Sequence, residues 1–182
     1  MEAGASAVTD QAKPELHGAA ILAAIKASGV EFILSVPDIV TSAGLLRPIA
    51  RDPELRLVRV CKEDECIGIA SGLHYCDKRA LILIQYTGFL DSINAIRAVA
   101  VEYKQPICMM IGLLGHEPER APTQSGRYGV RIMEPILDAM GIAHGLISQD
   151  ADVPKIKPAI EQAYAQSLPV ALLIGRRPLP PG

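Results

Sequence analysis

The 182-residue chain has no tryptophan, and aromatic residues make up only 4% of it. Surfaces that bind single-stranded nucleic acid by stacking need several exposed rings among basic residues. An excess of positive charge is also lacking, because 18 Lys and Arg stand against 20 Asp and Glu, for a formal net charge of -2. We therefore expect no nucleic-acid partner and no attraction to anionic membrane surfaces.

The four cysteines form neither a CxxC pair nor a metal-ligand spacing with histidine, so we expect no metal site. No apolar run reaches the roughly 20 residues of a membrane span. The N-terminus lacks the basic start and apolar run of a secretion signal. These absences predict a cytoplasmic protein with no membrane segment.

Phosphate-binding signatures are absent too, since the sequence has no GxGxxG fingerprint and no Walker-type loop. A nucleotide-binding role is therefore not predicted. His17, His74 and His144 have no partner at catalytic spacing and are interpreted as structural.

Six short apolar runs alternate along the chain with longer helical patterns. The runs lie at residues 31–36, 56–60, 79–85, 106–112, 142–147 and 169–175. Runs such as ALILI and ICMMI are apolar on both faces, which is typical of a parallel sheet covered by helices on both sides. The sequence predicts a doubly wound α/β fold with a mainly parallel six-stranded sheet, in one domain over 14–175. Residues 1–13 are expected to be a flexible leader and 176–182 a Pro-rich tail.

Four helices have recognisable ends. Pro14 suits the first turn of a helix that Gly29 ends, and Asp91 is expected to cap a helix over 91–103. Two further helices are predicted over 133–140 and 152–166.

Ligands of such folds bind at the carboxyl ends of the strands. The segments expected there are Pro37-Asp38, the acidic cluster at 62–65, residues 86–88 and the loop from Leu113 to about Tyr128. The acids at 62–65 have two readings. They can stabilise a helix start by about 0.3–1 kcal/mol each, or one can point into a cleft and exchange a proton with a bound heterocycle.

The segment QYTG at 85–88 follows an apolar strand, and Gly88 is expected to allow a turn there; an ordinary strand-to-helix connection is the alternative. The loop 115–131 carries three arginines and a histidine, which suit an anionic substrate. A solvated charged loop explains the same residues. Cys66 is interpreted as a buried hydrophobe, with a reactive role left open.

Four segments together carry a family resemblance: GVEFILSVPD at 29–38, KEDECIGIASGL at 62–73, ALILIQYTGFLDSINAI at 80–96 and the strand 106–112. The chain resembles the pyrimidine-binding domain of thiamine diphosphate enzymes. It is most similar to sulfopyruvate decarboxylase alpha subunits, with phosphonopyruvate decarboxylases next. The resemblance covers about residues 14–175, and its most specific parts are the acid nine residues before Gly72 and the QxxGxxxSINA pattern.

The resemblance implies that Glu63 is the catalytic glutamate that hydrogen-bonds the aminopyrimidine ring of thiamine diphosphate. It implies a reaction in which a 2-oxoacid loses carbon dioxide. The expected cofactor-binding residues are Glu63, Pro37, Asp38, Gln85, Thr87 and Gly88. The expected substrate-binding residues are Tyr86, Asn94, His116, Arg120, Gln124 and Arg127.

In the same family a GDG motif in a separate domain holds the diphosphate and Mg²⁺, and this chain has no GDG motif. The resemblance therefore implies a beta subunit that carries that domain, in an α2β2 or larger assembly.

The sequence departs from the family pattern at Tyr86, Thr87, Cys66 and Leu114. The expected substrate is 3-sulfopyruvate, converted to sulfoacetaldehyde and carbon dioxide. Phosphonopyruvate, another small 2-oxoacid and a carboligation reaction remain open. So do a noncatalytic partner or regulatory module of the same fold and a stand-alone ligand-binding domain.

Overall fold

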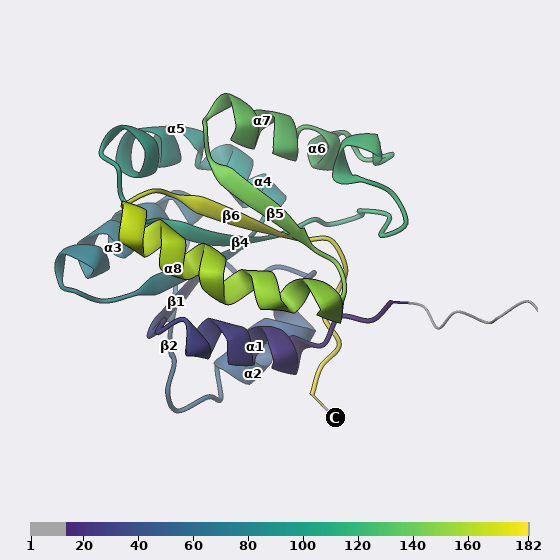
Figure 1. The fold of residues 1–182 in the computed structure, drawn as a ribbon, viewed down its shortest axis with the longest axis horizontal. Coiled ribbons are helices and arrows are strands. Elements are labelled where there is room, and N and C mark those ends of the chain that lie inside the picture. The colour runs from purple at the N-terminus through teal and green to yellow at the C-terminus, as the bar shows by residue number, and fades with distance from the viewer. Residues whose placement is uncertain (1–13, 182) are drawn as a thin grey trace, which may run out of the picture.

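A six-stranded, entirely parallel sheet runs through the structure, a computed structural model that describes residues 14–181 (Figure 1). The strand order is β2-β1-β3-β4-β6-β5. The strands are β1 (Phe32–Ser35), β2 (Arg56–Arg59), β3 (Ala80–Gln85), β4 (Cys108–Gly112), β5 (Ala143–Ile147) and β6 (Val170–Ile174). The leader expected over 1–13 lies outside the described residues.

Helical segments cover both faces of the sheet (Figure 1). One layer holds α1 (Gly18–Ala27), η1 (Ser42–Leu46), α2 (Arg47–Ile49), η4 (Asp150–Lys155) and α8 (Ile156–Gln166). The other holds α3 (Glu63–Tyr75), α4 (Tyr86–Asp91), α5 (Ile93–Ala95), η2 (Ile96–Glu102), η3 (Pro122–Gln124), α6 (Tyr128–Arg131) and α7 (Met133–Ala139). The predicted doubly wound α/β fold is confirmed.

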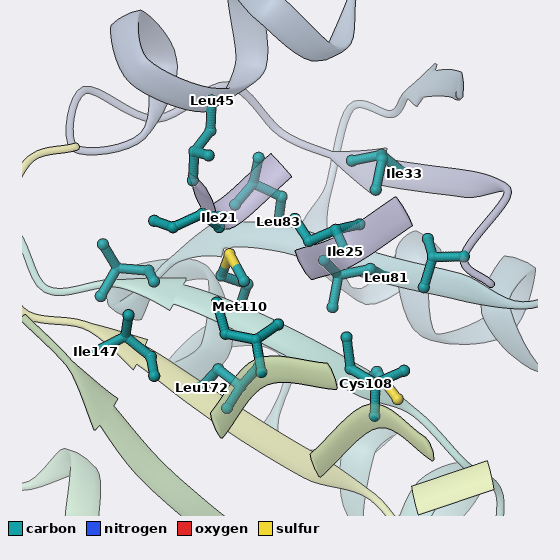
Figure 2. Packing of buried hydrophobic residues seen from close by; sticks show 14 of the residues in the cluster. Ile21, Ile25, Ile33, Leu45, Leu81, Leu83, Cys108, Met110, Ile147 and Leu172 are labelled. Carbon is teal, nitrogen blue, oxygen red and sulfur yellow. The ribbon is translucent and has the colours of Figure 1, made fainter. Parts of the chain in front are cut away.

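Alternate residues of the central strands pack into opposite cores. In β3, Leu81 and Leu83 join the core beneath α1 and α8, which Figure 2 shows, whereas Ile82 and Ile84 join the core under α3 and α4. Every one of these side chains is fully buried. Both faces of a strand between two helical layers must be apolar, which explains the continuous apolar runs in the sequence.

The order of the strands places a topological switch point between β1 and β3. From β1 the chain moves outward to the edge strand β2, and it then returns across α3 to β3 on the other side of β1. Ligands in open parallel sheets bind at such a point, beyond the carboxyl ends of the strands. The segments that follow β1, β2 and β3 therefore share one edge.

The first helix begins later than predicted. It starts at Gly18, not near Pro14, because the backbone before it is used elsewhere. Leu16 accepts a hydrogen bond from the amide of Leu179 (2.8 Å), and Glu15 accepts one from the amide of Asp150 (2.8 Å). The start of α1 is thereby held between η4 and the Pro-rich segment after β6.

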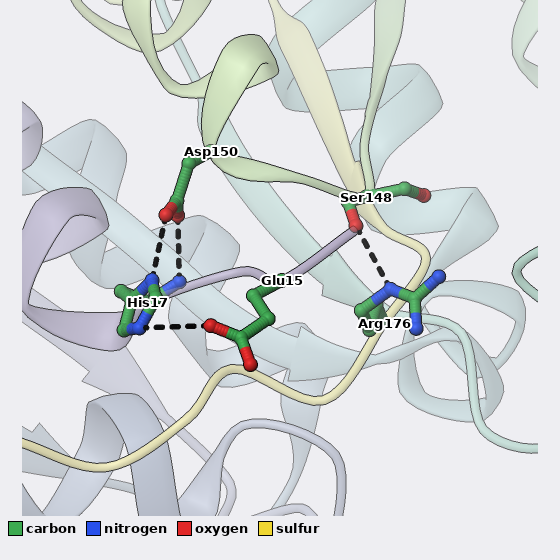
Figure 3. A network of polar contacts seen from close by, with 5 residues as sticks. All are labelled: Glu15, His17, Ser148, Asp150 and Arg176. Atoms are coloured by element: carbon green, nitrogen blue, oxygen red, sulfur yellow. Dashed lines mark hydrogen bonds and ion pairs between the residues drawn. The ribbon is translucent and has the colours of Figure 1, made fainter. Parts of the chain in front are cut away.

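A polar network fixes this junction, as Figure 3 shows. Asp150 accepts hydrogen bonds from the backbone amide of His17 (2.8 Å) and bonds its Nδ1 (2.6 Å), and Glu15 lies 3.5 Å from Nε2. The hydrogen bond to Asp150 raises the pKa of His17 above its ordinary value. Nearby, Arg176 donates to the Ser148 carbonyl oxygen (3.1 Å). These contacts give His17 a structural partner that sequence spacing did not reveal.

The prediction for the last helix also needs correction at its start. The last helix begins as the 3₁₀ segment η4 and becomes α-helical only at Ile156, because Pro154 lies within its first turns.

Within residues 14–181, no helix combines the length and apolar character needed to cross a membrane.

Candidate functional site

Glu63 and Gly88 meet at the carboxyl edge of the sheet. Glu63 is the first residue of α3, which follows β2, and Gly88 lies in the first turn of α4, which follows β3. A methyl group added at Gly88 would overlap Cγ, Cδ and Oε1 of Glu63. The Glu63 carboxylate therefore lies directly against the backbone of α4, and only glycine leaves room for it there.

The three acids at the start of α3 have different surroundings. Glu65 accepts hydrogen bonds from the amides of Cys61 (2.9 Å) and Lys62 (3.1 Å), which satisfies two backbone donors at the start of α3. Asp64 lies 3.6 Å from the Lys62 ammonium. The half-buried carboxylate of Glu63 has no hydrogen bond or ion pair with any of the residues 14–181. Glu63 is thus the acid of this cluster that is left to bind something else.

The helix after β3 begins at once, so the predicted turn at Gly88 and cap at Asp91 are wrong. Gln85 is extended (φ -88°, ψ 160°) and the helix starts at Tyr86, which places Gly88 inside it. Asp91 is its last residue, and its carboxylate lies 3.5 Å from the Lys62 ammonium. The hydroxyl of Thr87 donates to Oε1 of Gln85 (3.0 Å), so these two expected cofactor residues contact each other.

Pro37 and Asp38 follow β1 at the same edge, but the Asp38 carboxylate is occupied. Its oxygens accept hydrogen bonds from the amide and hydroxyl of Thr41 and from the amide of Val40. Asp38 is buried and Pro37 is exposed. The role of Asp38 in the structure is to hold the turn that leads into η1.

The loop after β4 is organised by its own polar residues. The ring nitrogens of His116 bond the carbonyl oxygens of Gly175 (2.8 Å) and Arg120 (3.0 Å). Glu117 accepts a hydrogen bond from the Ser125 hydroxyl (2.6 Å), which holds the pKa of that carboxyl below its ordinary value. The loop therefore contains fixed turns and the short segments η3 and α6, and His116 serves as one of its anchors.

The other expected substrate residues are spread over this edge. Arg127 is exposed and its side chain lies over Gly115. The side chain of Arg120 and that of Gln124, in η3, are exposed on the same loop. Asn94 is exposed on α5, where it accepts hydrogen bonds from Arg97 (3.0 and 3.3 Å). Among residues 14–181, the side chain of Asn94 has hydrogen bonds with Arg97 alone and none with the loop or with Glu63.

Tyr86 connects the start of α4 to the end of the loop. Its ring lies against Gly129 in α6, where an added methyl group would overlap the ring edge. Tyr86 and the segment that carries Arg127 are therefore neighbours in space, as the shared sheet edge predicts. Sequence reasoning missed Gly129; its position next to Tyr128 and Arg131 carried no signal that a ring packs there.

Cys66 is fully buried one turn after Glu63. Burial, together with the negative charge of Glu63, raises the pKa of the Cys66 thiol to about 12. The reactive role left open for Cys66 is thus disfavoured, because the thiolate is the nucleophilic form. Among residues 14–181 no cluster of three or more His, Cys, Asp or Glu side chains is arranged to hold a metal ion.

Similarity to known proteins establishes the family of this chain. The chain is 33% identical over 157 residues to the sulfopyruvate decarboxylase subunit alpha of Methanocaldococcus jannaschii, which covers 85% of this chain and 90% of that protein. It is 29% identical over 157 residues to the subunit alpha of Methanococcus maripaludis, covering 85% of this chain and 92% of that protein. The chain belongs to the family of sulfopyruvate decarboxylase alpha subunits. The predicted family membership is confirmed.

Two further comparisons complete the picture for this alpha-subunit family member. A benzoylformate decarboxylase from Polynucleobacter necessarius has the same fold, with a TM-score of 0.65 and 16% identity; the match covers 92% of this chain and 32% of that one. A sulfopyruvate decarboxylase of Methanosarcina acetivorans is 25% identical over 85% of this chain, which spans only 38% of that longer protein. No family model matches the sequence.

We predict that Gly88→Ala lowers the free energy of unfolding by about 1–3 kcal/mol, because the new methyl group overlaps the Glu63 side chain. Urea unfolding of the purified chain measures this change. Gly68→Ala is the matched control: Gly68 lies in α3 with nothing within 4 Å of the added methyl group. That change should be neutral or stabilise the helix by up to about 1 kcal/mol.

A double variant sharpens this test. If the overlap is with Glu63, combining Gly88→Ala with Glu63→Ala restores most of the lost stability, so the two substitutions are not additive. Strict additivity would contradict the close contact.

We also predict that Cys66 and Cys108 resist alkylation in the folded chain, since both are buried and burial raises the pKa of each thiol to about 12. Iodoacetamide at pH 8, followed by peptide mass spectrometry, should label the exposed Cys61 and Cys76. All four thiols should label in urea. Rapid labelling of Cys66 in the native chain would contradict this account.

Proposed function

We propose that this chain is the alpha subunit of a split thiamine-diphosphate-dependent decarboxylase that converts 3-sulfopyruvate to sulfoacetaldehyde and carbon dioxide. The observation that carries the proposal is the Glu63 carboxylate, which is half-buried at the carboxyl edge, lies against Gly88 and has no partner within residues 14–181. Membership of the family supports the reaction class, and the position of Glu63 supports its proposed role.

The surroundings of Glu63 fit the aminopyrimidine ring of thiamine diphosphate. A carboxylate that lacks internal donors can accept a hydrogen bond from a protonated ring nitrogen, or give the proton back. The absence of a side chain at Gly88 lets the Glu63 carboxylate lie close to α4, and the α4 backbone closes off one side of that carboxylate. Gln85, Thr87 and Gly88 of the neighbouring segment would border the ring.

When bound, thiamine diphosphate supplies a thiazolium carbon that adds to the ketone of a 2-oxoacid and accepts the electron pair released with carbon dioxide. Glu63 would hold a proton at the pyrimidine ring nitrogen and return it.

The substrate would bind at the loop after β4. 3-Sulfopyruvate carries a carboxylate and a sulfonate, both of which suit forked guanidinium contacts. Arg120 and Arg127 have exposed side chains there, and Tyr86 packs against the end of the same loop. These residues would provide binding and orientation together with the exposed Gln124, whereas His116 would act by anchoring the loop.

A beta subunit would complete the active site. In this proposal a beta subunit holds the diphosphate and Mg²⁺, because these 182 residues contain no GDG motif. Two observations support a partner. The relatives are named as alpha subunits, and the Methanosarcina acetivorans protein is long enough to contain a further part beside the matched segment. An α2β2 or larger assembly is the expected arrangement.

We predict that Glu63→Gln lowers the turnover of the assembled enzyme by about 10²- to 10⁴-fold, the range for loss of an acid–base group. The amide keeps the shape of the side chain, so stability and assembly should change little. Steady-state release of carbon dioxide from 3-sulfopyruvate is the measurement.

Asp64→Asn is the control for the loss of one charge at the same helix start. Among the described residues Asp64 pairs with Lys62 alone, in an exposed contact, so the turnover of Asp64→Asn should stay within about twofold of normal. Near-normal turnover of Glu63→Gln would exclude the proposed role.

We predict that Arg127→Ala raises the KM for 3-sulfopyruvate by about 10- to 100-fold and lowers kcat much less, because a charge-assisted contact contributes about 1.5–3 kcal/mol. Arg120→Ala is tested in parallel, since either arginine could hold the sulfonate. Arg56→Ala serves as a control, because Arg56 is the first residue of β2 and so lies at the opposite edge of the sheet. Unchanged kinetics in both Arg120→Ala and Arg127→Ala would refute the assigned role of the loop.

A further inference from the structure

Three arginines surround an open hollow next to the carboxyl ends of β1 and β2. Arg47, Arg51 and Arg59 line it, together with Pro37 and small or apolar neighbours, around a volume of about 460 Å³. The function proposed above does not use these arginines. Of the residues that line the hollow, only Pro37 also belongs to the expected cofactor site.

The local structure explains why the arginines converge. Arg47 begins α2, and Arg51 follows four residues later, which is the spacing of neighbours on one helical face. The backbone turn continues there, because the amide of Arg51 bonds the carbonyl oxygen of Pro48 (3.0 Å). Arg59 ends β2, so its side chain reaches the same edge of the sheet from the neighbouring strand.

The positive charge of the hollow is not neutralised within residues 14–181. None of the three guanidinium groups has an ion pair with a described residue. Two acids lie in the same connection, but Asp52 and Glu54 both pair with Lys26, at 2.9 and 2.7 Å. Three like charges around one space repel each other, and an anion between them removes that repulsion.

We propose that this hollow is a second anion-binding site, which takes a small oxyanion bearing a sulfonate, phosphate or sulfate group. Guanidinium groups donate paired, parallel hydrogen bonds to such oxygens. Three of them around a concave space can surround one group from several directions. The site does not depend on Glu63 or on a cofactor.

The oxyanion has two possible sources, which share this chemistry. It is a free inorganic anion, or it is the sulfonate of a substrate or product of the proposed reaction. Isothermal titration of the full chain with sulfate, phosphate and sulfoacetate, at constant ionic strength set with potassium chloride, separates them. Tighter binding of sulfoacetate indicates the second source, and equal or tighter binding of inorganic anions indicates the first.

The variants Arg51→Gln and Arg59→Gln test the location. Each should weaken the binding of the preferred anion by about tenfold or more, as expected for loss of one charge-assisted contact. Arg56→Gln is the matched control, since it removes the same charge three residues earlier in β2. Arg56 lies over the Phe32 ring at 5.6 Å, and its removal should leave binding unchanged.

Three results would overturn the proposal: no saturable binding of any of the three anions, binding that Arg51→Gln and Arg59→Gln leave unchanged, or binding that Arg56→Gln weakens equally. Thermal unfolding confirms that the variants remain folded, which is expected because the arginines are exposed. Glu63→Gln should bind the anion normally. Loss of catalysis and loss of this site are therefore distinguishable.

Discussion

The candidate site depends on the close contact between the Glu63 carboxylate and the helix backbone at Gly88, where no side chain is present. Glu63 enters from α3, Gly88 belongs to α4, and the two helices follow strands on either side of β1. A larger residue at position 88 would push the carboxylate away from its place. The site therefore depends on glycine at position 88 as much as on Glu63.

The fold supplies this meeting point through its connections. Because α3 crosses from the edge strand back over β1, its first turn reaches the carboxyl edge where the strand order reverses. Capping by Glu65 and the ion pair of Asp64 with Lys62 fix that first turn and leave Glu63 without a hydrogen-bond or ion-pair partner among the described residues 14–181. Polar groups that the fold itself does not satisfy are the ones available to a ligand.

Much of the fold followed from the sequence, because strands buried on both faces must be apolar throughout, as ALILI in β3 is. The start of α1 at Gly18 and the start of α4 at Tyr86 could not be predicted. Hydrogen bonds with the distant Leu179 determine the first, and the second helix begins directly after the extended Gln85. Motif spacing singled out Glu63. The arginine hollow was missed because Arg59 meets Arg47 only through the pairing of β1 with β2.

The central claim is that the chemistry belongs to a site that this chain shares with a second subunit. The most direct test measures carbon dioxide release from 3-sulfopyruvate, with thiamine diphosphate and Mg²⁺, by this chain alone, by a beta subunit bearing the GDG motif alone, and by the two combined. Saturable activity is expected only in the combination. Full activity of either chain alone, or an inactive combination of two folded and associated subunits, would contradict it.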